Sequence, residues 1–242
     1  MTPPNRFAGK RAAVSLTYDD AMHAQLDHAI PQLNRAGFRG TFFINTRSGE
    51  CISQRADEWR QAAASGHELG NHTQYHPCPQ KPGQPPNPRA SEAYSLAQIE
   101  QELVDAEKDL DAIVPVPAGS RSFAFPCGVS WVGPERTSYR RATARMFAAC
   151  RGGGVPDDVP AHREKFFAGR GVTDATPQET IIGYIDDAIA RGDWLIYVFH
   201  GIGGGWLSLA NERHEHLLAE LRRREADVHV APFGDVARMR RA

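Results

Sequence analysis

The sequence lacks the features that would place it in a specialised class of protein. No apolar stretch in its 242 residues is long enough to cross a bilayer, and the first residues lack the apolar core of a signal peptide. The formal net charge is −1, so charge does not indicate binding to nucleic acid or to an anionic membrane. We expect neither partner. As written, the protein is expected to be cytoplasmic, or extracellular or periplasmic if a signal was removed. The sequence leaves the oligomeric state unknown.

Cysteine is scarce, and its spacing matches no thiolate metal motif. The four cysteines are Cys51, Cys78, Cys127 and Cys150, with no C-x-x-C pair among them. Thiolate zinc sites need closer spacing than this. Four cysteines can form two disulfides in any of three pairings, or they can stay free. We expect free, partly buried thiols.

The hydrophobic content of 41% is enough for a packed core, and apolar segments of two kinds alternate along the chain. Strand-type runs lie at 12–17, 40–45, 67–73, 121–126, 194–200 and 228–233. Helical patterns lie at 22–36, 55–65, 95–113, 135–149, 177–191 and 207–224. This alternation predicts a parallel α/β sheet or barrel in a single domain, 1–242. The proline-rich segment 77–90 is expected to be a surface loop of that domain, because strand–helix units continue on both sides of it.

Polar residues follow four of the expected strands. They are Asp19, Asp20, His72, His76, the segment 126–128 and His200. In α/β barrels the carboxyl ends of the strands carry the active site, so strand ends that are distant in sequence converge there. The alternative for Asp19, Asp20, His72 and His76 is that they are polar surface residues or helix caps, with Asp20 as an N-cap. His200 has the alternative of a hydrogen-bonded structural histidine.

These residue types fit metal-assisted hydrolysis. A catalytic zinc ion takes three protein ligands and leaves one position for water. His72, His76 and one aspartate supply such a set, and the other aspartate can accept a proton from water. His200 can protonate a leaving group. Trp131 and Trp206 follow strand-end motifs and can stack on a sugar, although tryptophan is more often a core residue. His67 is expected to be structural, and His214 is expected to lie on the surface of a helix.

Four motifs together resemble a known family. "TYDD" (17–20), "HTQYH" (72–76), "FAFPCG" (123–128) and "VFH" (198–200) are similar, in order and spacing, to motifs of the polysaccharide deacetylases. These form carbohydrate esterase family four, with the NodB-homology domain. The resemblance covers about residues 11–235. It implies a distorted (β/α) barrel of seven or eight strands and the removal of acetyl groups from sugars, as N-acetyl amides or O-acetyl esters.

Carried over to matching positions, the resemblance implies Asp19 as general base and His200 as general acid. It implies one divalent ion, expected to be zinc, on Asp20, His72 and His76. The backbone N–H of Cys127 would stabilise the oxyanion. The residues expected to contact substrate are Tyr18, Pro126, Val198, Trp131, Trp206 and Arg151.

The chain departs from the family pattern at two positions of the third motif. Ala124 stands where the family commonly has an arginine that orients the base, and Cys127 stands where it has a tyrosine. Arg151 and Arg170 are candidates to replace that arginine. Two other functions remain open for this sequence. One is hydrolysis of a non-sugar amide or cyclic imide by the same fold, and the other is carbohydrate binding without catalysis.

Overall fold

The fold is described from a computed structural model, which describes residues 7–47, 51–154 and 157–241. The chain forms two compact units, and each is described by itself. Unit 1 consists of Met1–Phe42, Gln61–Glu68 and Gly169–Ala242, and unit 2 of Phe43–Arg60 and Leu69–Ala168. No helix in the described part of the chain is long and apolar enough to cross a membrane.

The main sheet is parallel, as the strand–helix alternation predicts. Its strand order is β8-β7-β4-β3-β2-β1-β10-β9, with β11 pairing with β1. β2 and β3 contribute residues to both units. The bounds are β1 (Ala12–Asp19), β2 (Thr41–Ile44), β3 (Glu68–Asn71), β4 (Ser122–Ala124), β7 (Ala149–Arg151), β8 (Phe166–Phe167), β9 (Arg170–Gly171), β10 (Trp194–Phe199) and β11 (Val228–Val230).

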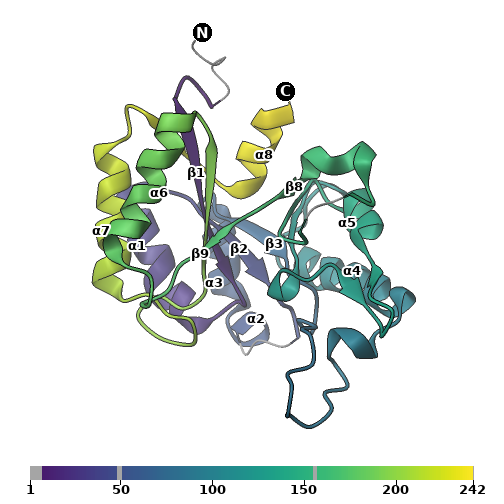
Figure 1. The fold of residues 1–242 in the computed structure, drawn as a ribbon. Coiled ribbons are helices and arrows are strands. Elements are labelled where there is room, and N and C mark those ends of the chain that lie inside the picture. The colour runs from purple at the N-terminus through teal and green to yellow at the C-terminus, as the bar shows by residue number, and fades with distance from the viewer. Residues whose placement is uncertain (1–6, 48–50, 155–156, 242) are drawn as a thin grey trace. The chain divides into compact units, whose positions relative to one another are not determined.

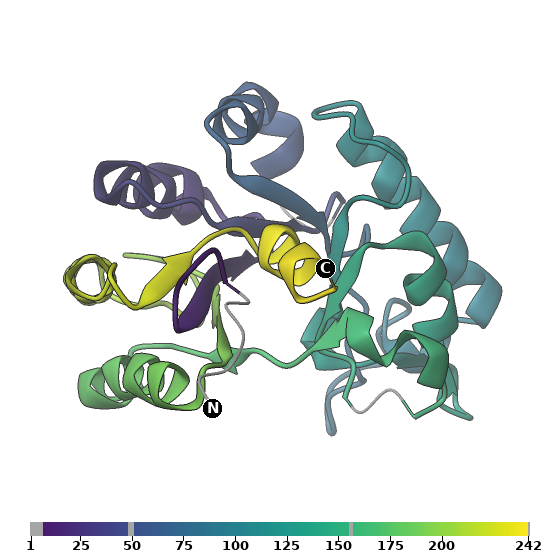
Figure 2. The same ribbon diagram turned by 90° about the horizontal axis from the view of Figure 1, so that it is seen from above.

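Unit 1 is built around β1, every residue of which is buried. Such a strand is covered on both faces, and its buried Ser15 and Thr17 hydroxyls donate to the backbone carbonyls of Ala231 and Tyr197. Three helices, α1 (Ile30–Ala36), α6 (Gln178–Arg191) and α7 (Asn211–Arg223), lie side by side (Figures 1 and 2). α8 (Phe233–Arg241) packs on β1. A π-helical turn, Gln25–Ala29, leads into α1.

Unit 2 has its own apolar core. It is formed by Ile99, Leu103, Phe123, Phe125, Val132, Tyr139, Ala142, Phe147 and Cys150. α4 (Leu96–Asp111) begins with a capping box, in which the Ser95 side chain accepts from Gln98 N–H. A hairpin of β5 (Trp131–Val132) and β6 (Thr137–Ser138) precedes α5 (Arg140–Met146). The remaining elements among the described residues are α2 (Cys51–Gln54), α3 (Ala56–Ala64) and the 3₁₀ turns Ser91–Ala93, Pro126–Gly128 and Pro160–Lys165.

The expected helix 135–149 is wrong at both ends. Near its start, Thr137–Ser138 pair with Trp131–Val132, and its last residue begins β7, which pairs with β4. Strand pairing therefore overrides the helical pattern there. The sequence pattern also did not predict α8.

The expectation of free thiols is wrong for two cysteines. Cys78 and Cys127 form a disulfide across a sequence separation of 49 residues. Cys150 is a buried thiol in the core of unit 2, and the side chain of Cys51 lies outside the described residues. The pairing depends on where the loop 77–90 begins relative to the end of β4, and spacing alone does not reveal that.

Candidate active site

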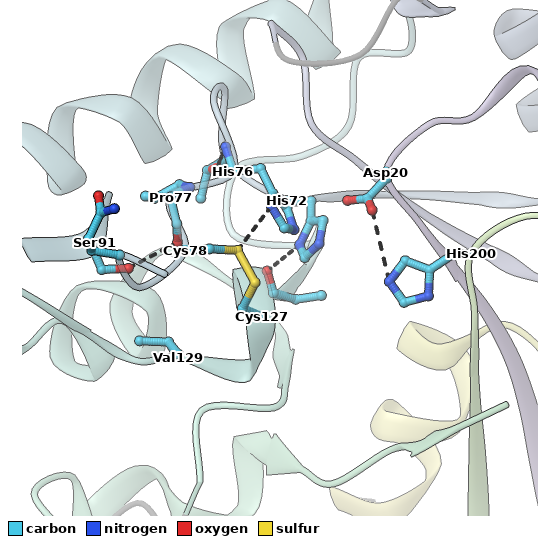
Figure 3. The surroundings of a disulfide bond; sticks show 12 residues. Asp20, His72, His76, Pro77, Cys78, Ser91, Cys127, Val129 and His200 are labelled. Atoms are coloured by element: carbon cyan, nitrogen blue, oxygen red, sulfur yellow. Dashed lines mark hydrogen bonds and ion pairs between the residues drawn. A yellow bond between two sulfur atoms is a disulfide. The ribbon is translucent and has the colours of Figure 1, made fainter. Parts of the chain in front are cut away.

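In unit 1, two paired strands carry three of the predicted residues. β1 and β10 are parallel, with Tyr18 opposite Phe199, so Asp19 and His200 are the next positions along each strand. Asp19 and Asp20 are both 5% exposed. His200 Nε2 lies 3.9 Å from Asp20 Oδ2 (Figure 3). The sheet register thus brings together residues about 180 positions apart, as the strand-end argument requires.

Gln25 holds the backbone of these two strand ends. Its buried amide Nε2 donates to the carbonyl oxygens of Asp19 at 2.5 Å and His200 at 3.1 Å. This residue was not predicted, because a glutamine in the segment after a strand carries no motif signal. Its role follows only from the π-helical turn that places it beneath both strand ends.

Trp206 is a contact of Asp20 within unit 1. Its indole Nε1–H donates to Asp20 Oδ2 at 3.0 Å, and the side chain is 57% exposed. A hydrogen bond from an outer residue to a carboxylate fixes the orientation of that carboxylate. The exposed ring face remains available to a ligand, so the geometry is compatible with sugar stacking.

In unit 2, His72 and His76 flank a tight turn after β3. The Asn71 side chain accepts from Thr73 N–H at 2.8 Å, and the Thr73 hydroxyl accepts from His76 N–H at 3.0 Å. Glu102, from α4, accepts from Tyr75 N–H at 2.8 Å. These side-chain hydrogen bonds take the place of the backbone hydrogen bonds of a helix or strand in this turn. The centroids of the two imidazole rings lie 4.7 Å apart.

Each imidazole has its Nδ1 next to an acceptor. His72 Nδ1 lies 2.7 Å from the carbonyl oxygen of Ala124, and His76 Nδ1 lies 3.4 Å from Cys78 Sγ (Figure 3). When Nδ1–H donates in a neutral ring, Nε2 carries the lone pair that a metal needs. The carbonyl oxygen of Ala124 only accepts, so His72 Nδ1 donates and its Nε2 is the atom that can bind a divalent cation.

Several residues of the sequence motifs adopt a left-handed backbone. The φ angles are 77° at Asp20, 66° at Thr73, 55° at His76 and 52° at Cys127. Outside glycine this conformation is uncommon and costs about 1–3 kcal/mol, and such residues cluster at functional sites. The backbone is strained at the positions that the motifs single out.

Arg151 lies next to the position at which the family commonly has an arginine and this chain has Ala124. In the β4–β7 register Arg151 pairs with Ala124, the residue that stands where the family has arginine. Its side chain is buried at 6% exposure, and its guanidinium lies 4.9 Å from the Phe43 ring centroid. Arg170 lies in β9 with its guanidinium 4.6 Å from the Tyr184 ring centroid.

The expectation that the Tyr18 side chain contacts substrate is wrong. The side chain is fully buried between Phe42 and Phe199, and its hydroxyl lies 2.7 Å from His214 Nε2. His214, expected on a helix surface, is also fully buried, and its Nδ1 contacts Gln32 Oε1. Gln32 Nε2 donates to Asn211, so Gln32 Oε1 accepts and His214 Nδ1 donates. His214 Nε2 therefore accepts from the Tyr18 hydroxyl.

The other predicted contacts differ in accessibility. Pro126 is buried, Val198 and Trp131 are half-buried, and Cys127 is exposed. Arg136 lies over the Trp131 ring, with its guanidinium carbon 4.8 Å from the centroid. His67 is structural, as expected, because Gly40 N–H donates to its Nδ1 at 3.1 Å and it is 4% exposed.

A family comparison matches the chain over more than half of its length. The model of the family described as polysaccharide deacetylase matches residues 8–144. A search of curated proteins found no match.

Solved structures share the fold. One, from Mycobacterium smegmatis and described as a polysaccharide deacetylase, is 15% identical over 96% of this chain and 91% of its own, with a TM-score of 0.64. The Bc1960 peptidoglycan N-acetylglucosamine deacetylase is 16% identical over 91% of this chain and 86% of its own, with a TM-score of 0.59. A CE4 family pseudoenzyme from Bacillus anthracis, BA3943, is 14% identical over 93% of this chain and 65% of its own, with a TM-score of 0.56. These likenesses confirm the expected (β/α) barrel class of deacetylases.

Proposed function

Because the chain belongs to the polysaccharide deacetylase family, we propose that it is a metal-dependent hydrolase that removes acetyl groups from an acetylated carbohydrate. The observation that carries the proposal is the contact of His72 Nδ1 with the carbonyl oxygen of Ala124. A carbonyl oxygen only accepts, so Nδ1 donates and Nε2 is left as the ligand atom.

The proposed metal ligands are Asp20, His72 and His76. Two imidazoles and a carboxylate suit zinc or a similar divalent ion, and we propose zinc. When bound, the cation supplies Lewis-acid activation of water and of the acetyl carbonyl. Trp206 orients the Asp20 carboxylate through its indole N–H. Ala124 holds the His72 ring through its carbonyl oxygen.

Proton transfer is assigned to Asp19 and His200. Asp19 accepts the proton of the attacking water, and His200 donates a proton to the departing amine or alcohol. Gln25 keeps the backbone of both residues in place. The backbone N–H of Cys127, in the turn after β4, donates to the developing oxyanion. We propose Arg151 as the residue that takes the place of the absent arginine, on the basis of its register with Ala124.

The substrate class is tested by acetate release. Structural relatives include a peptidoglycan N-acetylglucosamine deacetylase and the CE4 domain of a xylanase, so the panel contains acetylated chitooligosaccharides, peptidoglycan and acetylated xylan. Small acetylated amines are included as non-sugar substrates in the acetate assay. A cyclic imide releases no acetate when it is hydrolysed, so its ring opening is followed separately by the loss of its ultraviolet absorbance. We expect acetate from at least one saccharide, loss of release on chelation and dialysis, and recovery on adding zinc. Release that survives metal removal would overturn the mechanism.

A non-catalytic function gives a different result in the same samples. If none of the substrates is cleaved after zinc is added, while calorimetry shows saccharide binding, the chain is a carbohydrate-binding relative. One CE4 relative is described as a pseudoenzyme, which makes this arm a necessary part of the design.

A further inference from the structure

The disulfide joins the two short segments that carry His76 and Cys127. Cys78 lies two residues after His76, and Cys127 lies in the turn after β4. The ligand atoms of His76, Cys78 and Cys127 all lie within 4.8 Å of one another. Figure 3 shows the His76 imidazole facing the two sulfur atoms. Two thiolates and an imidazole are a ligand set for a thiophilic divalent cation.

We propose that reduction of the Cys78–Cys127 disulfide creates a second metal site, in which both thiolates and His76 Nδ1 bind a thiophilic divalent cation such as zinc or cadmium. The reductant is a dithiol. Its two electrons and two protons convert the disulfide into two thiols while it becomes a disulfide itself. Both thiols then release their protons on binding the cation.

The backbone around each cysteine is held by contacts that do not need the disulfide. Ser91 N–H donates to the carbonyl of Cys78 at 2.9 Å, and the Ser91 hydroxyl donates to the carbonyl of Pro77 at 3.2 Å. On the other side, Val129 N–H donates to the carbonyl of Pro126 at 2.9 Å. The two sulfurs therefore stay close together after reduction. Cys127 is exposed, which gives an ion access to the site.

The new site and the hydrolytic site compete for one histidine. A neutral imidazole has one nitrogen with a lone pair and one that carries a proton. If His76 Nδ1 binds a cation beside the two thiolates, Nε2 carries the proton and no longer ligates the hydrolytic ion. In the disulfide neither sulfur is a thiolate, so His76 is left to the hydrolytic ion. This consequence rests on the proposed function, whereas metal binding by the reduced pair does not.

The test uses cadmium and the ultraviolet charge-transfer absorption of its bonds to thiolates. Metal-free full-length protein is reduced with dithiothreitol, separated from reductant under anaerobic conditions and titrated with cadmium. We expect about one cadmium per chain in reduced wild type, with Cys78 and Cys127 protected from alkylation, and no thiolate band in the oxidised protein. Cys51 and Cys150 remain in a Cys78→Ser, Cys127→Ser double variant, which defines their background.

Two histidine variants make the assignment specific. His76→Gln is expected to weaken cadmium binding at least tenfold, because even outer contacts of metal ligands contribute about 10–100-fold in affinity. His216→Gln, which changes an exposed histidine on α7, is the matched control, and its thiolate band should be unchanged. If reduced wild type shows no more thiolate-bound cadmium than the double variant, or if His76→Gln binds as wild type does, the proposal is wrong.

Failure of the proposed function gives a different pattern. If the reduced protein binds cadmium through the two thiolates but the oxidised, zinc-loaded protein releases no acetate, only the hydrolase assignment falls. If the oxidised protein releases acetate and the reduced protein binds no cadmium, only the second site falls.

Discussion

Lowering the pH is predicted to destabilise the protein through two buried histidines of unit 1. Burial lowers the pKa of His214 from 6.5 to about 3. It also lowers the pKa of His67 to about 4, with a smaller effect of Arg39 in the same direction. Both folded-state pKa values lie below the unfolded value, so protons bind the unfolded chain first as the pH falls. The stability from these residues is complete above about pH 6.5 and is lost progressively below it.

The size of the loss follows from linkage. Each pH unit below the unfolded pKa costs about 1.4 kcal/mol for a histidine that stays neutral in the folded protein. Between about pH 7.5 and about pH 5, His214 and His67 should each contribute about 2 kcal/mol, or about 4 kcal/mol together. His214 cannot avoid this loss by local rearrangement, because Tyr18 and Gln32 engage both of its nitrogens.

Urea unfolding at the two pH values measures the effect, with the difference in free energy of unfolding as the readout. His214→Gln lowers stability overall, but it should also shrink that pH difference by about 2 kcal/mol. His67→Gln should shrink it by a similar amount. The control is His216→Gln, an exposed histidine two residues from His214 on the same helix, whose loss should leave the difference unchanged. The reasoning is refuted if both buried variants keep the wild-type pH difference.

Three further predictions concern the proposed site. Asp19→Asn should keep its metal content but lose about 10²–10⁴-fold in turnover, whereas the exposed control Asp187→Asn should keep wild-type acetate release. Full activity in Asp19→Asn would show that another group is the base. Trp206→Phe should weaken zinc binding about 10-fold in calorimetry, because the Asp20 carboxylate loses its indole partner; unchanged affinity would remove Trp206 from the site. Cys78→Ser should destabilise unit 2 by about 4 kcal/mol in urea, because the disulfide closes a segment with a 49-residue separation. A loss of less than about 1 kcal/mol would contradict that entropic account.

Much of the fold and of the candidate site could be predicted because it depends on patterns that are local in sequence. The apolar run of β1 ends at Asp19, and the run of β10 ends just before His200. Parallel pairing of β1 with β10 then places these two residues next to each other. This prediction does not require the structure of the intervening 180 residues. The two-histidine turn was equally visible, because its residues lie close together in the chain.

What could not be predicted depends on contacts between distant segments. Tyr18 lies beside the motif aspartates, yet its ring belongs to the core because Phe42 and Phe199 flank it. The disulfide depends on the conformation at the base of a proline-rich loop, which has no periodicity to interpret. The short strand β7 ends with Arg151 and is specified by its pairing with β4 rather than by its own sequence pattern.

The left-handed backbone at His76 and Cys127 has a consequence for how the protein can evolve. At such positions glycine relieves backbone strain of about 1–3 kcal/mol, so the residues that chemistry requires are not those that folding prefers. Replacing either residue with glycine would relieve that strain while it removes a ligand or a cross-link. If selection for hydrolysis were relaxed, drift at position 76 would therefore meet little resistance from stability. An inactive descendant would keep the barrel, so the fold alone would not distinguish it from an active enzyme.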